Sequence, residues 1–283
     1  MKQVATIDEI RNEIAELKAQ GKKIAFVPTM GALHEGHLSL MRLAKKKADE
    51  VVVSIYVNPE QFGPNEDFDE YPRKMEDDLK ACKDEGVVLV FTPNDEIMYG
   101  KGEKYFSIEV DQLNEYMDGG SRSGFFEGIV LVVNKLFNII KPDVAIFGQK
   151  DIQQFQILSK MAEEFNHDIE LVAAPIARAN DGLALSSRNA YLSEQDRKIA
   201  PSLYRALQYV EKQIREGVME PKLLLQHQQD ELEAKGFKND YLNVFSMKTM
   251  EPVEKLESGS TYILAGAVYL GKTRLIDNII LDL

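Results

Sequence analysis

Residues 28–37 read Pro28-Thr29-Met30-Gly31-Ala32-Leu33-His34-Glu35-Gly36-His37, and this stretch decides the fold. An apolar run at 24–27 precedes it, and an amphipathic run with Leu40, Leu43 and Ala44 follows it. This order predicts a strand, a tight turn and the start of a helix. The two histidines are three residues apart, a spacing that places both imidazoles on one helix face. Because helix N-termini attract anions, the stretch predicts a nucleotide phosphate site at the end of the first strand of the sheet.

Two other interpretations of the histidine pair stay open. Helical histidine pairs also bind zinc, and His34 and His37 could be unrelated surface residues. The chain has only four histidines, which makes a chance pair on one face rare. Cys82, His167 and His227 show no ligand-like spacing, so we predict no protein-bound metal site.

Composition is that of a globular protein large enough for one large or two modest domains, with 283 residues, 44% of them hydrophobic and 28% charged. The net charge of -12 and the lack of a long basic run argue against a nucleic-acid or anionic-membrane partner. An anionic substrate would need a locally positive pocket. No apolar run approaches the roughly eighteen residues of a membrane span, and residues 1–20 lack the apolar core of a signal peptide.

The single cysteine, Cys82, lies in a helical pattern and allows no intrachain disulfide. This fits a reducing compartment, so we expect a cytoplasmic protein. We expect Cys82 to be a partly buried structural thiol and not a nucleophile.

The β-branched, nearly all-apolar run at 51–57 predicts a strand covered on both faces, as in a parallel sheet. Amphipathic segments separate it from further apolar runs, which indicates right-handed βαβ units. The other expected strands are 24–27, 87–91, 144–147 and 170–174, with a short strand at 104–110 beside the sheet. We therefore predict an α/β fold with a Rossmann-like, doubly wound parallel sheet over residues 1–176.

The pattern changes after Pro175, and residues 177–283 are predicted to form a smaller α+β domain. Ser193 can cap a helix there, with Asp196 three residues further on. The expected elements are helices at roughly 194–216 and 221–235, followed by strands at 240–246, 260–268 and 273–281.

Other polar clusters suit an anionic ligand. Lys150 follows a strand end and a glycine, where it can pair with phosphate; as ordinary surface it would oppose the helix dipole. Residues 186–188 read Ser-Ser-Arg in a loop and could clamp a phosphate, although a serine-rich turn is the default. Gln61, Gln153 and Gln154 are amides that can bind a hydroxylated substrate, although each alone is more often polar surface.

Taken together, these motifs resemble the pantoate–β-alanine ligase (pantothenate synthetase) family of the nucleotidyltransferase superfamily, which is related in fold to class I aminoacyl-tRNA synthetases. A lone His-x-Gly-His is only moderately specific, but this set of motifs in this order is highly specific. The resemblance covers nearly the whole chain and runs through residues 27–37, 58–62, 71–73, 135–138, 147–154, 181–189 and 271–278.

The resemblance implies joining of pantoate to β-alanine with ATP and Mg²⁺, through a pantoyl-adenylate, in the pathway to coenzyme A. It implies that His37, His34, Lys150 and Arg188 are catalytic and that Gln61 and Gln154 bind pantoate and β-alanine. The implied ATP-binding residues are Met30, Gly31, Ala32, Leu33, His34, Glu35, Gly36, His37, Gly148, Gln149, Lys150, Asp151, Ala177, Leu185, Ser186, Ser187 and Arg188.

The resemblance also implies a homodimer, and a mobile loop at 185–188 carried by a lid domain at 177–283. The chain departs from the family at residues 122–126, which read Arg-Ser-Gly-Phe-Phe where Arg-Pro-Gly-His-Phe is usual. Leu131 replaces a common threonine, and Gln149 stands where many members have glutamate. No role is carried over for the 122–126 segment.

Two alternatives remain at this point. Another adenylyl- or cytidylyltransferase would share the histidine motif but attack with a phosphate, which needs cations where this chain has Gln61 and Gln154. An inactive nucleotide-binding homologue would bind ATP without releasing pyrophosphate, and the changes at Ser123 and Phe125 leave that reading open.

Overall fold

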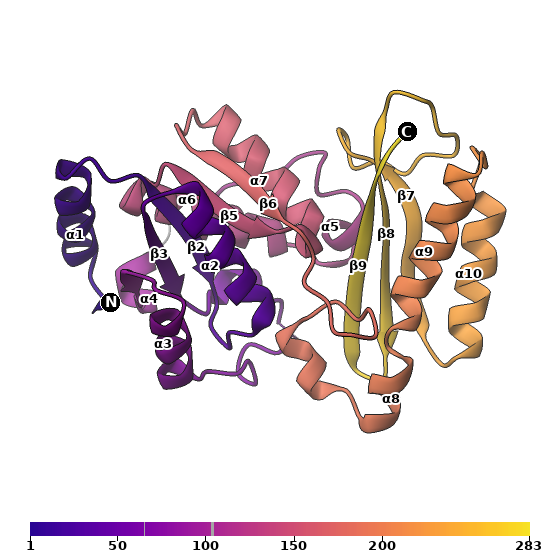
Figure 1. The fold of residues 1–283 in the computed structure, drawn as a ribbon, viewed down its shortest axis with the longest axis horizontal. Coiled ribbons are helices and arrows are strands. Elements are labelled where there is room, and N and C mark those ends of the chain that lie inside the picture. The colour runs from indigo at the N-terminus through magenta and orange to yellow at the C-terminus, as the bar shows by residue number, and fades with distance from the viewer. Residues whose placement is uncertain (65, 103–104) are drawn as a thin grey trace. The chain divides into compact units, whose positions relative to one another are not determined.

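Figure 1 shows the computed structural model, which describes residues 1–64, 66–102 and 105–283. The chain forms two compact units. The first comprises Met1–Val110, Arg122–Gln149 and Gln154–Pro175, and the second comprises Asp111–Ser121, Lys150–Gln153 and Ile176–Leu283. Among the described residues, no helix combines the length and apolar character needed to cross a bilayer.

The first unit is built on a six-stranded sheet in the order β1-β4-β3-β2-β5-β6, in which every pair is parallel. The strands are β1 Lys2–Val4, β2 Ile24–Thr29, β3 Glu50–Ile55, β4 Leu89–Phe91, β5 Val144–Gly148 and β6 Glu170–Ala174. The helices and 3-10 turns that belong to or enter this unit are α1 Ile7–Ala19, α2 Glu35–Lys47, η1 Pro59–Gln61, α3 Met75–Asp84, α4 Asp95–Tyr99, α6 Phe125–Ile140, η2 Gln149–Asp151 and α7 Ile152–Glu164.

Both faces of this sheet are covered. Ala25 and Val27 belong to a core cluster that includes buried residues of α2 and α3, whereas the intervening Phe26 is fully buried on the opposite face. Helix α2 lies along β2, β3 and β5 (Figure 1). The predicted Rossmann-like α/β fold is therefore confirmed.

Strand β2 is the switch point of the sheet, where the order in which strands are added reverses, because β2 pairs with β3 on one side and with β5 on the other. The chain builds outward through β3 and β4 and then returns to β5. Open α/β sheets bind ligands at the carboxyl end of such a switch-point strand. The turn at residues 30–37, which carries His34 and His37 and is called the histidine turn below, follows β2 directly and so occupies this position.

Cys82 lies on the inner face of α3 and is fully buried. Burial raises the pKa of its thiol from an ordinary 9.0 to about 12, with a smaller contribution from the charge of Asp78. Since the thiolate is the reactive form, we expect a thiol-alkylating reagent at about pH 8 to label Cys82 only after unfolding. Mass spectrometry along a urea titration checks this, and rapid labelling of the folded protein would contradict it.

The same shift has a consequence for stability. The unfolded thiol ionises near its ordinary pKa of 9.0, while the pKa of the folded thiol is about 12. The contribution of the protonated Cys82 thiol to the free energy of unfolding is therefore complete below pH 9 and declines as the pH rises from 9 to about 12.

The second unit has a three-stranded antiparallel sheet in the order β7-β8-β9. Figure 1 shows α9 and α10 along this sheet, where α9 contacts β8 and β9 and α10 contacts β7. Apolar residues of α9 and α10, such as Leu207 and Leu232, form one buried cluster with the strands. The elements are α5 Met117–Ser121, η3 Ser187–Tyr191, α8 Glu194–Ile199, α9 Ser202–Arg215, α10 Lys222–Ala234, β7 Lys238–Ser246, β8 Thr261–Leu270 and β9 Thr273–Asp282.

Two local predictions were wrong. The helix expected over 194–216 is two helices, because α8 ends at Ile199 and α9 begins at Ser202. Pro201 lies between them, and its ring and missing N–H interrupt a continuous helix. The short strand expected at 104–110 is also not formed by its described part, 105–110; residue 104 lies outside the described residues. The short edge strand β1 was not foreseen.

Candidate active site

The turn after β2 brings the two histidine rings together. His34 is the N-cap of α2, and its Nδ1 accepts the N–H of Gly36 at 3.1 Å. His37 reaches back in the same way, and its Nδ1 accepts the N–H of His34 at 3.3 Å. The ring centroids are 4.2 Å apart. The two imidazoles lie side by side as predicted, although His34 is the extended N-cap and only His37 lies within the helix.

These two hydrogen bonds define the chemistry of both rings. In a neutral imidazole one nitrogen donates and the other accepts. Because Nδ1 of His34 and of His37 is the acceptor, the proton of each neutral ring is on Nε2. The turn therefore carries two ring N–H donors of the same kind side by side, which suits recognition of an anion.

The backbone of the turn is held by a buried carboxylate that the sequence analysis did not single out. Asp78, on α3, accepts the N–H groups of Ala32 at 2.9 Å and of Leu33 at 2.7 Å. Gly31 has φ +83°, and a Cβ there would come within 2.9 Å of Asp78 Oδ2. Glycine is therefore required at this position. Because Asp78 takes up these N–H groups, anion recognition by the turn depends more on the histidine rings than on its backbone.

Gln61 lies at the end of η1 in the first unit. Its side-chain oxygen accepts a 3.1 Å hydrogen bond from Asn58 Nδ2, and Asn58 is almost fully buried. Gln154 is a half-buried residue near the start of α7, also in the first unit. The roles implied for Gln61 and Gln154 remain predictions.

Gln153, in contrast, has a structural role. Its amide oxygen accepts from the N–H groups of Asp118 and Gly119, and its nitrogen donates to the carbonyls of Leu113 and Tyr116 at 2.8 Å each. All four partners are backbone groups of the 113–119 segment. A buried amide with its bonding capacity used in this way holds a loop and is poorly placed to bind substrate.

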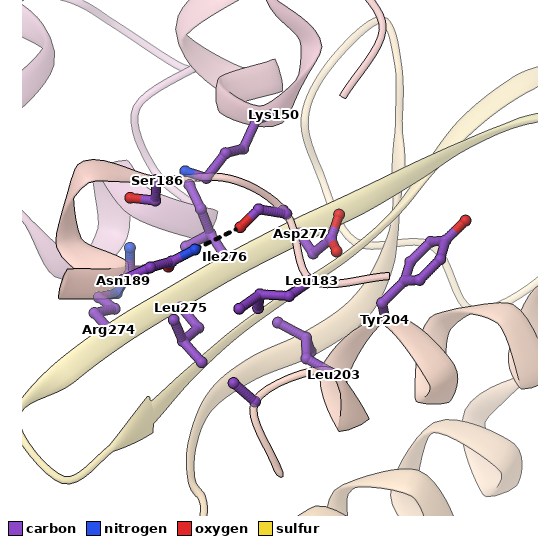
Figure 2. A pocket seen from close by; sticks show the side chains of 12 residues that line it. Lys150, Leu183, Ser186, Asn189, Leu203, Tyr204, Arg274, Leu275, Ile276 and Asp277 are labelled. Carbon is purple, nitrogen blue, oxygen red and sulfur yellow. Dashed lines mark hydrogen bonds between the residues drawn. The ribbon is translucent and has the colours of Figure 1, made fainter. Parts of the chain in front are cut away.

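In the second unit, Lys150 and Ser186 line one small pocket together with Asn189 and β9 residues such as Asp277 (Figure 2). Asn278 donates from Nδ2 to the Lys150 carbonyl at 2.9 Å, so β9 holds the backbone that carries this lysine. Lys150 and the serine loop, residues 185–188, therefore contribute to one pocket, the loop through Ser186. The complete lining is Lys150, Leu183, Ala184, Ser186, Asn189, Ala200, Leu203, Tyr204, Arg274, Leu275, Ile276 and Asp277.

The serine loop is tied to the segment that contains Ala177. Leu185 donates its N–H to the Ala177 carbonyl at 2.9 Å, and Arg178 forms an isolated β-bridge with Ala184. Ser186 caps η3 by accepting the N–H of Arg188 at 3.3 Å. The implied ATP contacts at 177 and 185–188 therefore belong to one hydrogen-bonded structure.

Charges near this pocket are largely paired. Arg178 forms a two-pronged ion pair with the buried Asp277, with N–O distances of 2.5 and 2.8 Å, and its guanidinium lies over the Tyr204 ring. Arg274 is held between Asp118 and Asp240 at 2.6 and 2.8 Å. Lys150 lies 3.6 Å from Asp151 at its Nζ. Lys150 is therefore the pocket cation with the loosest pairing.

The segment that departs from the family pattern has its own contacts. Arg122 makes two hydrogen bonds to the Glu66 carboxylate at 2.7 and 2.6 Å, and its guanidinium stacks 3.3 Å from the Phe125 ring centroid. The aromatic ring that replaces the usual histidine therefore supports an arginine ion pair. Gly124 has φ +81° at the N-cap of α6.

No group of three or more His, Cys, Asp or Glu side chains that could hold a metal ion is present among the described residues. The two histidine Nδ1 atoms accept backbone hydrogen bonds, so neither can ligate a metal through that atom without losing its bond.

A parallel sheet with a helix N-terminus at its switch-point strand is typical of α/β enzymes that bind nucleotides. Comparison with known proteins gives the family. The family model described as "Pantoate-beta-alanine ligase" matches residues 2–280. A pantothenate synthetase of Fervidobacterium nodosum is 46% identical over 282 residues, covering 100% of both chains. One from Bacillus subtilis is 44% identical and covers 100% of this chain and 98% of its own.

Solved structures agree. A pantothenate synthetase from Thermus thermophilus superposes with a TM-score of 0.90 at 38% identity, covering 99% of each chain. The pantoate–β-alanine ligase of Francisella tularensis, solved in complex with "Beta-gamma ATP" and β-alanine, has a TM-score of 0.82 at 33% identity and covers 99% of this chain and 97% of its own. The chain belongs to the pantoate–β-alanine ligase family. The two alternative functions are not favoured.

Proposed function

We propose that this chain condenses pantoate with β-alanine at the expense of ATP, releasing AMP and pyrophosphate. The observation that carries the proposal is the histidine pair, whose Nδ1 atoms accept backbone N–H groups so that both Nε2 atoms carry the ring protons. Membership of the pantoate–β-alanine ligase family supports the same reaction.

In the first half-reaction, a pantoate carboxylate oxygen attacks the α-phosphorus of ATP, the bond to the bridging oxygen breaks, and pyrophosphate leaves. Negative charge grows on the phosphoryl oxygens. Donors fixed in advance stabilise such charge without reorganising, and His34 and His37 have this arrangement. From the resemblance we propose that Lys150 and Arg188 add positive charge at the phosphates. No covalent enzyme intermediate is required.

Neutral amides suit the acid substrate. Gln61 and Gln154 can orient pantoate by hydrogen bonds while leaving its carboxylate charge intact. An arginine at either position would pair with that carboxylate and lower its nucleophilicity.

In the second half-reaction, the β-alanine amine attacks the carbonyl carbon of the pantoyl-adenylate, the acyl–phosphate bond breaks, and AMP leaves while the amine loses a proton. The mixed anhydride hydrolyses if water reaches it, so the reaction benefits from a closed site. We propose that residues 177–283 serve as the lid, with the 185–188 loop over the nucleotide.

Mg²⁺ is proposed to enter with ATP, where it would neutralise phosphate charge. It prefers oxygen ligands, keeps several waters and needs only one or two carboxylates beside the phosphates. Asp151 is a half-exposed carboxylate of the implied ATP set and could supply one ligand. From the resemblance we also propose a cytoplasmic homodimer.

A coupled assay tests the proposed function. ATP, D-pantoate and the enzyme should support exchange of pyrophosphate into ATP, and steady AMP release should require β-alanine in addition. AMP production that ignores pantoate, or that requires a phosphate nucleophile instead, would refute the proposal.

Replacing Gln61 or Gln154 with alanine is expected to raise the KM for pantoate by about tenfold or more, because each change removes hydrogen bonds to an ionised substrate. The KM for ATP should change much less. Steady-state kinetics with each substrate varied separately checks this, and an equal loss of both affinities would contradict the assigned roles.

A further inference from the structure

The orientation of the Asn58 amide follows from its neighbours. Its Oδ1 accepts the Tyr99 hydroxyl at 2.5 Å and the backbone N–H of Glu60 at 3.3 Å. The backbone N–H of Glu60 can only donate, so the atom it meets is the amide oxygen, and the Tyr99 hydroxyl donates to the same atom. Nδ2 therefore faces the other way, where it donates to the Gly128 carbonyl and to Gln61 Oε1, both at 3.1 Å.

The orientation of Gln61 follows in turn. Because Asn58 donates to Gln61, the atom that faces Asn58 must be the carbonyl oxygen of the Gln61 amide. The NH₂ end is then the end presented to whatever binds beside Gln61. If Asn58 were turned over, its oxygen would face Gln61, and the Gln61 amide would have to turn over too. The substrate would then meet an acceptor.

Tyr99 adds a side-chain donor to the backbone groups of Glu60 and Gly128 that orient Asn58. Its hydroxyl makes the shortest of the Asn58 hydrogen bonds, and it lies at the end of α4, far from Gln61 in sequence. Burial raises the pKa of Tyr99, and the nearby charges of Glu60 and Asp95 raise it further, so the phenol stays a donor. The neighbouring Tyr56 hydroxyl donates instead to Asp95 at 2.8 Å.

We propose that Tyr99 is a positioning residue that acts through Asn58 to direct the amide NH₂ of Gln61 toward the acid substrate. The inference rests on the proposed function in that Gln61 is taken to bind pantoate. A carboxylate and its neighbouring hydroxyl oxygens accept hydrogen bonds, so an NH₂ group attracts the acid, and a carbonyl oxygen in its place would repel it. Tyr99 thereby favours binding of an anionic acid at this position.

Tyr99→Phe tests the proposal, because it removes the donor and keeps the ring. We expect the KM for pantoate in pantoate-dependent ATP–pyrophosphate exchange to rise about tenfold, as on weakening one hydrogen bond to an ion. The KM for ATP should stay within about twofold. Tyr56→Phe is the matched control: it removes a hydroxyl from the adjacent ring, 6.4 Å away between centroids, without touching Asn58. It should leave both KM values within about twofold.

A double-mutant cycle separates positioning from general damage. In a Gln61→Ala background, Tyr99→Phe should change the KM for pantoate no further, since the group that it directs is gone. Asn58→Asp provides a second route: it keeps an acceptor for Tyr99 but places an oxygen against Gln61 and against the Gly128 carbonyl, so it should raise the KM for pantoate more with Gln61 present than in the Gln61→Ala background.

The outcomes are distinct. If Gln61→Ala leaves the KM for pantoate unchanged, the assigned role of Gln61 fails and the inference fails with it. If Gln61→Ala raises that KM but Tyr99→Phe does not, or if Tyr99→Phe has the same effect with and without Gln61, the inference alone is overturned. Thermal unfolding of each variant shows that it is folded, and Asn58→Asp tests the step from Asn58 to Gln61 separately from the step from Tyr99 to Asn58.

Discussion

Replacing His37 with alanine is expected to slow pantoyl-adenylate formation by about 10²–10³-fold, the usual loss for one transition-state donor. The structure gives the reason, since His37 Nδ1 accepts the His34 N–H and its Nε2 therefore carries the proton that would meet the phosphoryl group. Because the same bond fixes His34, the variant should also lose part of the function of its neighbour. Pantoate-dependent ATP–pyrophosphate exchange measures the effect.

His167→Ala is the matched control, because His167 bonds Asn134 at 2.8 Å and takes no part in the histidine turn. Its exchange rate should stay near that of the unmodified protein. Loss of the His37 ring also removes a cap from α2, so the free energy of unfolding should fall by about 0.5–2 kcal/mol. Exchange within a few-fold of normal in a folded His37→Ala protein would exclude His37 as the phosphoryl donor.

The second large effect is expected at Gly128, where a methyl group has no room. A Cβ there would lie 2.8 Å from the Gln61 backbone nitrogen and closer still to the Glu60 carbonyl. These are backbone atoms of η1 and cannot rotate away. Gly128→Ala should therefore displace the turn that carries Gln61. A shift of about 1 Å in a positioning element can cost about 10²-fold in rate, so we expect that loss in kcat/KM for pantoate.

The free energy of unfolding of the Gly128→Ala variant should also be lower by about 1–3 kcal/mol, as for other overpacked cores. Gly102→Ala is the control, since a Cβ at Gly102 meets nothing within 4 Å. Urea unfolding and pantoate kinetics, measured on both variants, separate the two effects. Unchanged pantoate kinetics in Gly128→Ala would show that η1 tolerates the displacement.

The sequence was sufficient for features that local pattern controls. The run of apolar residues before residue 28 and the amphipathic run after His37 were enough to predict strand, turn and helix, because strand and helix periodicities differ. The pairing of the histidines followed from their spacing. The helix boundary at Pro201 was also readable, since proline rarely continues a helix, and it was overlooked.

Features made by distant residues could not be read from local pattern. Asp78 contacts Ala32 and Leu33 across more than forty positions, and nothing near it in sequence indicates those partners. One signal existed, because Asp78 lies four residues before Cys82, on the same buried helix face. The bonds from Tyr99 to Asn58 and from Gln153 to the 113–119 segment likewise depend on the tertiary fold. The catalytic and binding roles of the candidate residues remain predictions.

The two stretches proposed to bind the nucleotide differ in how locally they are assembled. The histidine turn needs residues 29–37 and Asp78, which lies 45 positions beyond Leu33. The pocket of Lys150 and Ser186 needs β9, whose Asn278 reaches back 128 positions to the Lys150 carbonyl. Contacts of such sequence separation cost more chain entropy to close and form late in folding. A partly folded chain can therefore have its histidine pair in place before Asn278 bonds the Lys150 carbonyl. Nucleotide binding that needs both stretches is then a property of the fully folded chain.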